Sequence, residues 1–345
     1  MNSRERVNAA MRHEQPDRVP VWCLLSLEHI VTFGTEDGAI PDTIEELVTA
    51  ECNLAKRYRF DGTIIYAPGQ SRGARIDAWV KESIDDVPGG DSSHVLEQAD
   101  PESWEREEPR YQADDFYSSH LTREIMGEDH HVGGWAADGF SLALQWFPRL
   151  EDALIATAKD PGRFQALVDY FDAQSVAWAK AQIQLGRLES IQISSPYAGS
   201  SFISPKMYRS FVLPSVGKLA QAIGSVGGFS YLHTCGFISD RLEIFVETGV
   251  DGIECMDPPP LGDVTLAEAK KRVGRQLFLK GNIDSVNVLL RGDDETVDET
   301  VRQTIQAGMP GGGYILSTAC SVAPRVPPER VQRLWELVEQ YGEYG

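Results

Sequence analysis

The stretch GGFSYLHTCGFISDRLEIFVETGVDGIECMD, residues 227–257, contains the structural unit that decides the fold. The apolar run 227–235 predicts a strand, and 252–257 predicts another. Between them, the amphipathic segment 237–249 predicts a helix that ends at a Gly. A strand, a helix and a second strand in this order place the two strands side by side and in parallel.

The same alternation of strand and helix continues in both directions along the 345 residues. Eight parallel strand–helix units close into a (β/α)8 TIM barrel, so we expect an α/β fold and a single domain over residues 1–345. A doubly wound open sheet is the alternative, but the Gly-rich phosphate turn that it needs after an early strand is absent from the sequence. The eight predicted core strands are residues 19–25, 62–67, 130–136, 190–195, 227–235, 252–257, 276–282 and 314–320.

Residues 74–118 interrupt this alternation after the second predicted strand. They are polar and rich in Asp, Glu, Pro and Gly, with short extended pieces such as DAWVKESIDD at 77–86. We interpret them as an insertion that forms a β-hairpin-like lid. A surface loop with no part in the chemistry is the alternative.

Composition excludes several classes of function. Lys and Arg number 32 against 52 Asp and Glu, and the net charge of −20 disfavours nucleic acid and anionic membranes as partners. No apolar run approaches the roughly 20 residues of a membrane span, and residues 1–20 lack the apolar core of a signal peptide. An odd number of cysteines, five, argues against a disulfide framework, so we expect a cytoplasmic protein.

His233 and Cys235 form the most specific candidate site. They are two residues apart on a predicted strand, so their side chains face the same side, and they lie at its carboxyl end, where barrels place their active sites. Cys320 ends the eighth predicted strand, at the same face of the barrel. Two thiolates and an imidazole suit zinc, and three protein ligands leave one position open. The alternative is that all three are ordinary buried residues.

Glu254 and Met256 are predicted to point into the barrel, while Ile253 and Cys255 face the helices. A buried Glu needs a partner, and Lys280 on the next strand is the expected one. An additional zinc ligand or a proton-transfer group is the functional interpretation of Glu254.

Aromatic residues cluster near the ends of the second, third and fourth predicted strands. They are candidates for the wall of a substrate pocket, with ordinary packing as the alternative. Asp138 follows the third strand and is interpreted as a helix cap or solvated acid, or else as a group that serves the substrate. The aromatic candidates are Tyr66, Trp135, Trp146, Phe147, Tyr197 and Phe202, and Met256 is added to them as a substrate-binding candidate.

Five segments resemble the uroporphyrinogen decarboxylase superfamily, in order and over nearly the whole chain. They are RERVNAAMRHEQPDRVPVW (4–22), YLHTCG (231–236), GVDGIECMDPPPLGD (249–263), LKGNID (279–284) and GGGYILSTACSVAPRVPPERV (311–331). A His-x-Cys pair followed by a distant Cys is similar to the zinc-dependent, corrinoid-linked methyltransferase branch, which includes methylcobamide:coenzyme M methyltransferases. The resemblance implies that His233, Cys235 and Cys320 hold zinc.

The decarboxylase branch is disfavoured by two absences. Its Arg-rich run after the first strand is replaced here by residues 22–26, Trp-Cys-Leu-Leu-Ser, and its Asp after the second strand by residues 66–70, Tyr-Ala-Pro-Gly-Gln. Many methyltransferase relatives have an acid after the fourth strand, where this chain has Ser-Ser-Pro at 194–196.

The resemblance implies methyl transfer between a small thiol, methoxy or other methylated compound and a corrinoid, such as methylcobalamin, carried by a partner protein. A metal-free lyase of the decarboxylase type and a non-catalytic barrel in a methyl-transfer system are the alternatives.

Overall fold

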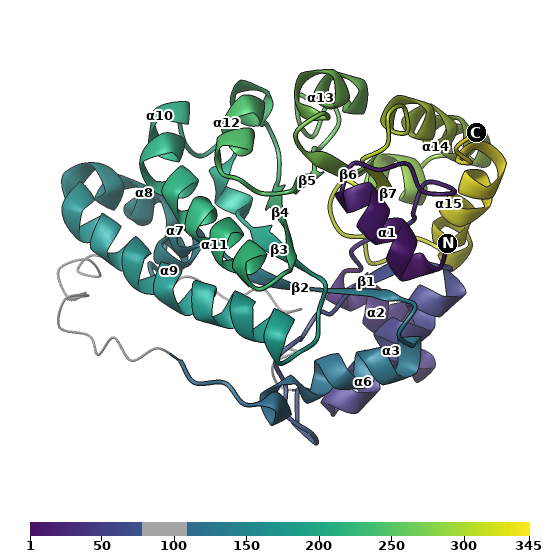
Figure 1. Ribbon diagram of the computed structural model, residues 1–345, viewed down its shortest axis with the longest axis horizontal. Helices are drawn as coiled ribbons and strands as arrows, with labels where there is room; N and C mark the ends of the chain where they lie inside the picture. The colour runs from purple at the N-terminus through teal and green to yellow at the C-terminus, as the bar shows by residue number, and fades with distance from the viewer. Residues whose placement is uncertain (78–108) are drawn as a thin grey trace.

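The computed structural model describes residues 1–77 and 109–345. Its described strands form a curled parallel sheet of seven, each paired with the next in chain order (Figure 1). This order is the one that successive strand–helix units produce when every crossover has the same hand. The strands are β1 (Gly62–Ile64), β2 (His131–Ala137), β3 (Ser190–Ser194), β4 (Phe229–Thr234), β5 (Gly252–Cys255), β6 (Phe278–Ile283) and β7 (Tyr314–Thr318).

Residues 19–25 lie between the last strand and the first. The backbone N–H of Trp22 donates to the carbonyl of Leu316 on β7 at 3.0 Å, and the N–H of Asp61 donates to the carbonyl of Val21 at 2.7 Å. The segment makes isolated parallel bridges to β7 and its continuation rather than the regular strand that we predicted. The reason is visible at Val21, whose N–H donates to the Asp61 carboxylate at 2.9 Å instead of to a neighbouring strand.

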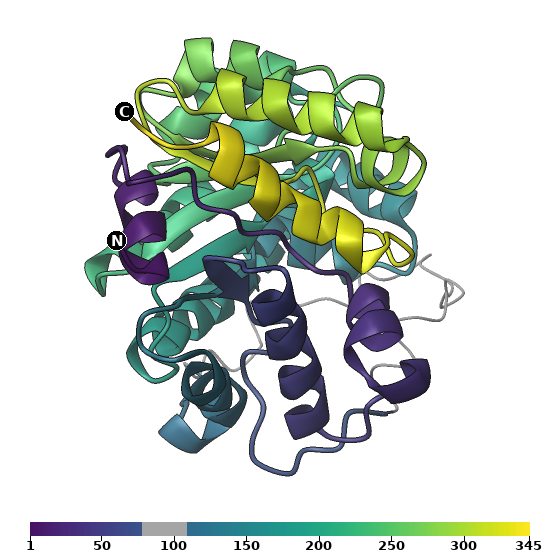
Figure 2. The same cartoon turned by 90° about the vertical axis from the view of Figure 1, so that its right-hand side faces the viewer.

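Helices cover the outside of the curled sheet, and α14 and α15 lie side by side near the carboxyl terminus (Figure 2). The two termini are close together, since both contact Asp17: the ammonium of Met1 donates to its carboxylate at 3.0 Å, and the N–H of Tyr344 donates to its carbonyl at 3.1 Å. The described helices are α1 (Ser3–Met11), α2 (Leu27–Gly34), α3 (Ile44–Arg57), α6 (Tyr117–Met126), α7 (Gly139–Gln145), α8 (Leu150–Lys159), α9 (Pro161–Gln184), α10 (Pro205–Met207), α11 (Leu213–Ser225), α12 (Leu242–Glu247), α13 (Leu266–Val273), α14 (Asp294–Gly308) and α15 (Pro328–Tyr341), with short 3-10 and π turns between some of them.

A cluster of large side chains fills the concave side of the sheet. Trp22, Tyr231 and Phe278 are fully buried there, and Tyr231 contacts Trp22 edge to face and Phe278 at a tilt. Gly62 and Gly252 make room for this cluster, because a Cβ atom at these positions would lie 2.8 Å and 2.4 Å from the rings of Trp22 and Phe278. The concave side of the sheet is therefore packed with side chains.

Most of the predicted insertion at 74–118 lies outside the described residues. On its near side, Arg75 makes an isolated antiparallel bridge with Thr43, and on its far side residues 113–126 are helical. The β-hairpin itself stays a prediction. No helix within residues 1–77 and 109–345 combines the length and the apolar composition that crossing a membrane requires.

Candidate metal centre

Three strand ends bring one imidazole and three sulfur atoms together. His233 lies near the end of β4 and Cys235 just after it, Cys255 ends β5, and Cys320 follows β7 by two residues. Their ligand atoms all lie within 4.8 Å of one another. The structure therefore unites the three residues that the sequence pointed to, and it adds Cys255.

The two nitrogens of His233 face different partners. Nε2 lies 3.2 Å from the sulfur of Cys235 and 3.9 Å from that of Cys320. Nδ1 lies 3.2 Å from a carboxylate oxygen of Glu254. A carboxylate behind the imidazole fixes the ring and leaves the other nitrogen toward the sulfurs, which is the arrangement found behind most metal-ligating histidines.

Glu254 is itself held by two buried side chains. The ammonium of Lys280 contacts one carboxylate oxygen and the amide of Gln192 donates to the other. Burial alone would raise the pKa of Glu254, but the charge of Lys280 and the contacts with His233 and Lys280 lower it to about 2. The predicted Glu254–Lys280 ion pair is therefore present, across the register that pairs these two residues on β5 and β6.

Strict alternation along β5 predicted that Cys255 faces the helices, but in the structure its sulfur lies in the cluster with His233. The backbone of Cys255 is left-handed, with φ of 79°, and the next residue, Met256, has φ of 52°. These values end the alternation after Glu254, and the sulfur of Cys255 joins the cluster. The prediction was wrong because sequence periodicity describes a regular strand and carries no sign of where its backbone turns.

The charges of the cluster favour a thiolate at Cys320 beside an imidazolium at His233, while contacts with Cys235 and Cys320 raise the pKa of the Cys255 thiol well above its usual value. Hydrogen bonds with Cys235, Cys255 and His233 hold the pKa of Cys320 well below its usual value. Burial disfavours a charged imidazole, but hydrogen bonds with Cys235, Cys320 and Glu254 raise the pKa of His233 well above its usual value. A metal cation would take the place of the imidazolium proton, because ligation requires neutral histidine and ionised cysteine.

This donor set fits zinc. Thiolate sulfur and imidazole nitrogen are the ligands that zinc prefers, whereas magnesium and calcium require oxygen. The Glu254 oxygens are occupied by His233, Lys280 and Gln192, so this carboxylate supports the histidine from behind.

Loops after neighbouring strands are tied together above the cluster. The N–H of Gly236 donates to Asp257 at 2.7 Å, and the N–H groups of Ile238 and Ser239 donate to Asp263 at 2.9 and 3.0 Å.

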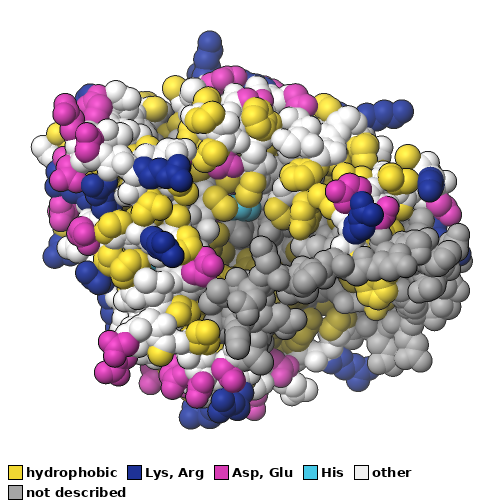
Figure 3. All heavy atoms as spheres, turned by 180° about the vertical axis from the view of Figure 1, so that it is seen from behind, with side chains coloured by type: hydrophobic (Ala, Val, Ile, Leu, Met, Phe, Trp, Pro, Cys, Tyr) yellow, Lys and Arg dark blue, Asp and Glu magenta, His cyan; other side chains and the backbone are white. Residues whose placement is uncertain are grey.

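One face of the molecule is hollowed near its centre, with hydrophobic side chains and a histidine around the hollow (Figure 3).

A family model described as uroporphyrinogen decarboxylase (URO-D) matches residues 2–341. The chain belongs to the uroporphyrinogen decarboxylase family. It is 25% identical to the methylcobamide:CoM methyltransferase MtaA of Methanosarcina barkeri over 347 residues, which cover 97% of each protein. It is 29% identical to the uroporphyrinogen decarboxylase of Streptomyces coelicolor over 181 residues, 52% of this chain and 47% of that protein.

The solved structure of a methyltransferase from Methanosarcina mazei has the same fold. Its TM-score is 0.76 at 18% identity, and the match covers 99% of each chain. Together with the family match, the similarity to MtaA confirms the resemblance to the methyltransferase branch of the uroporphyrinogen decarboxylase family that the sequence motifs indicated.

In this member of the uroporphyrinogen decarboxylase family, Asp138 occupies the space beside the end of β3. It caps α7 by accepting the N–H of Ser141 at 2.5 Å, as expected, but it is fully buried rather than solvated. Its second oxygen accepts the hydroxyl of Ser195, whose N–H donates to the carbonyl of His233 at 2.9 Å. Burial raises the pKa of Asp138 to about 6. A carboxyl is thus linked through one serine to His233 of the candidate metal centre.

The aromatic candidates form separate groups rather than one wall. The indole of Trp135 donates to the carbonyl of Tyr66 at 3.0 Å. Trp146 packs against Phe171 on α9, with ring centroids 5.9 Å apart, and Tyr197 packs against Phe202 at 5.8 Å. Trp135, Trp146 and Phe202 are exposed, whereas Phe147 is buried and Met256 has no exposed surface.

Sequence reasoning did not single out Gln192 or Ser195. Gln192 lies on β3 opposite Trp135 of β2 and Tyr231 of β4. The alternation of side chains along β3 could have predicted that Gln192 points inward. Its contact with Glu254, however, crosses from β3 to β5 and depends on the curl of the sheet. Ser195 lies one residue beyond β3, where periodicity no longer applies.

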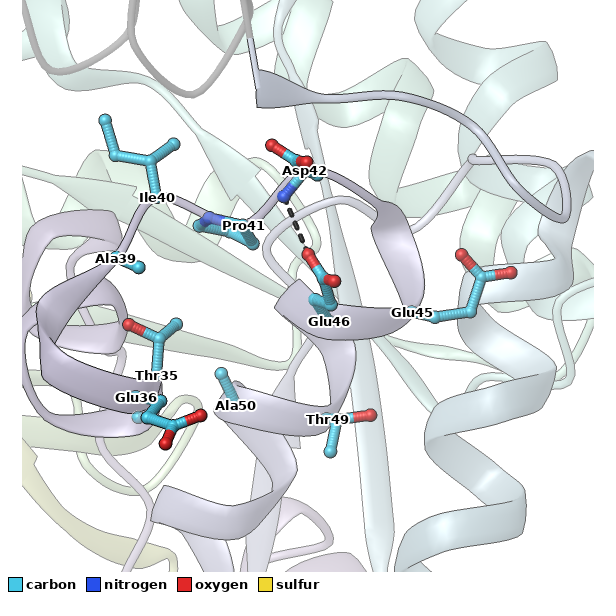
Figure 4. A pocket seen from close by; sticks show the side chains of 11 residues that line it. Thr35, Glu36, Ala39, Ile40, Pro41, Asp42, Glu45, Glu46, Thr49 and Ala50 are labelled. Carbon is cyan, nitrogen blue, oxygen red and sulfur yellow. Dashed lines mark hydrogen bonds between the residues drawn. The ribbon is translucent and has the colours of Figure 1, made fainter.

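A surface pocket of about 660 Å³ lies away from the metal centre, between α2 and α3 (Figure 4). Glu36, Asp42, Glu45 and Glu46 contribute four carboxylates to its lining. Glu46 is already engaged with the N–H of Asp42 at 2.7 Å, as part of the cap of α3. The pocket shares no residue with the cluster of His233 and the three cysteines.

Proposed function

We propose that the protein is a zinc-dependent methyltransferase that moves a methyl group between a small molecule and a corrinoid on a separate protein. The observation that carries this proposal is the convergence of His233, Cys235 and Cys320 at the strand ends of a chain that aligns along its length with a methylcobamide:CoM methyltransferase. Thiol or methoxy and similar methylated compounds are the proposed small molecules.

The three residues would hold zinc, which when bound supplies a Lewis acid that lowers the pKa of a substrate thiol or withdraws charge from a methylated leaving group. Glu254 acts from behind the site, because its contact with Nδ1 keeps Nε2 of His233 directed at the sulfurs. Lys280 and Gln192 keep Glu254 in place.

The mouth of the proposed barrel, at the carboxyl ends of the strands, supplies the groups that would contact the substrate and exchange protons with it. Tyr66, Trp135, Trp146 and Tyr197 are proposed to contact the substrate or the corrinoid, and Met256, which has no exposed surface, to support the substrate site from below. Asp138, whose pKa near 6 lets it hold a proton close to neutral pH, is proposed to exchange a proton with the substrate through Ser195.

Exposed Phe202, Phe237 and Leu261 follow three successive strands and give the mouth an apolar rim that suits a flat macrocycle. We further propose that residues 1–345 form one (β/α)8 domain, in which residues 19–25 are the first strand and join β7 to β1, and that the protein acts in the cytoplasm.

The test is an anaerobic assay that follows the cobalt absorption spectrum of methylcobalamin, free or protein-bound, with a panel of small thiols and methoxy compounds. Demethylation of the cobalt that a chelator stops and added zinc restores supports the proposal. The partial similarity to a uroporphyrinogen decarboxylase makes a metal-free lyase the second candidate. Decarboxylation of uroporphyrinogen by protein stripped of metal would establish that candidate and overturn ours.

A further inference from the structure

We infer that Cys255 is a fourth protein ligand, which holds the metal ion together with His233, Cys235 and Cys320 and leaves it when a small thiol binds. This inference rests on the metal site of the proposed function and assigns a role to a residue that the three-ligand site does not use.

The first observation is the place of the sulfur. The ligand atoms of Cys255, His233, Cys235 and Cys320 lie within 4.8 Å of one another. Three sulfurs and one nitrogen complete the four positions of a tetrahedral zinc site, as in the Cys3His sites of structural zinc. With no substrate bound, the centre therefore has a full set of protein ligands.

The second observation is the backbone. Cys255 and Met256 have φ values of 79° and 52°, in the left-handed region that residues with a side chain avoid. Such conformations are unfavourable and persist where the surroundings fix them, most often at functional sites. A regular β5 would turn the sulfur of Cys255 toward the helices, so the left-handed turn is what directs it to the cluster.

Burial singles out Cys255 as the ligand that leaves. It has no exposed surface, whereas Cys235 is half-buried and Cys320 is exposed. A released Cys255 thiol keeps a hydrogen-bond partner, because it lies beside the Asp257 carboxylate. Cys255 would take up the proton that the incoming thiol loses, so one sulfur–metal bond forms, one breaks and the charge of the centre stays the same.

X-ray absorption at the zinc edge of the zinc-loaded protein tests the fourth ligand. We expect three sulfurs and one nitrogen around zinc in the unmodified protein, and two sulfurs in Cys255→Ser. Cys52→Ala, which removes a buried cysteine on α3, is the matched control and should retain three. Two sulfurs in the unmodified protein would overturn the inference, whether or not Cys255→Ser folds.

Departure of Cys255 is tested with selenocysteamine, because the edge spectrum distinguishes selenium from sulfur. We expect one selenium to appear around zinc while the number of sulfurs falls from three to two. Selenium bound with all three sulfurs retained, or no bound selenium, would contradict it.

The two proposals fail separately. Methyl transfer by a protein whose zinc has only two sulfurs supports the function and refutes the role of Cys255. Three sulfurs around zinc in a protein that transfers no methyl group would support the role of Cys255 and refute the proposed function.

Discussion

Lys280 is fully buried, with its ammonium against Glu254 and 4.7 Å from the ring centroid of Trp22. Lys280→Met leaves the buried carboxylate without its cation, and breaking such a pair typically lowers the free energy of unfolding by about 3–5 kcal/mol. We expect a loss of this size in urea denaturation at constant metal content.

The control for this variant is Arg209→Met, which breaks an exposed ion pair with Glu247. Solvent screens exposed ion pairs, so this change should be nearly neutral. If Lys280→Met is as mild as the control, the ion pair does not hold the lumen together. Glu254→Gln combined with Lys280→Met should recover part of the loss, because both charges are then removed.

Asp138 gives a pH dependence with a definite sign. Burial raises its pKa from 3.8 to about 6, so the folded protein binds a proton that the unfolded chain has already released. Its contribution to stability is full below pH 3.8 and is lost as pH rises through about 6. Relative to Asp138→Asn, the unmodified protein should lose about 2–3 kcal/mol across this range. A pH-independent difference between the two proteins would contradict the shift.

At the residue scale, the sequence predicted the residues whose positions depend on strand ends or on the alternation of side chains along a strand. His233, Cys235 and Cys320 were found because each lies at the end of a predicted strand, and Glu254 with Lys280 because their phases agree. Cys255 was misplaced, since its position depends on a backbone turn. The link from Asp138 to Ser195 was not foreseen because the two residues meet only once the sheet has formed.

At the scale of elements, one boundary shows how local chemistry divides a continuous pattern. Residues 151–184 are amphipathic throughout, yet the structure has α8 and α9 there, separated at Asp160 with Pro161 as the first residue of α9. Pro is tolerated in the first turn of a helix and disfavoured inside one. The carboxylate of Asp160 accepts the N–H of Arg163 at 3.0 Å and caps α9.

Removal of this cap gives a prediction for the element. Asp160→Ala should lower the free energy of unfolding by about 1 kcal/mol, as losses of N-cap residues do, and Asp160→Asn should be nearly neutral because its amide oxygen also caps. Thermal or urea unfolding measures both. Equal losses for Ala and Asn would show that the carboxylate acts otherwise than as a cap.

Strand prediction was accurate where apolar runs are bounded by Gly or polar residues, as at β3 to β7. It was less so at residues 19–25, where a carboxylate from Asp61 takes a backbone N–H that a regular strand would share with its neighbour. Side chains that compete for backbone groups are not visible as periodicity.

At the scale of the whole molecule, the parallel order of the strands was predictable, because right-handed crossovers between successive strands allow few alternatives. That order brings the ends of β4, β5 and β7 to one face, where the candidate metal ligands meet. The net charge of −20 is consistent with a protein whose partners are neither nucleic acids nor anionic membranes.

The most direct test of the account is methyl transfer by protein stripped of metal and then titrated with zinc. The rate of methyl loss from methylcobalamin to a small thiol is measured at each addition. We predict no transfer without metal and a rate that rises to a plateau at about one zinc per chain, the stoichiometry of a single catalytic site. In Cys320→Ala the titration should stay flat. Transfer at full rate by the metal-free protein, or a plateau unchanged in Cys320→Ala, would contradict the account.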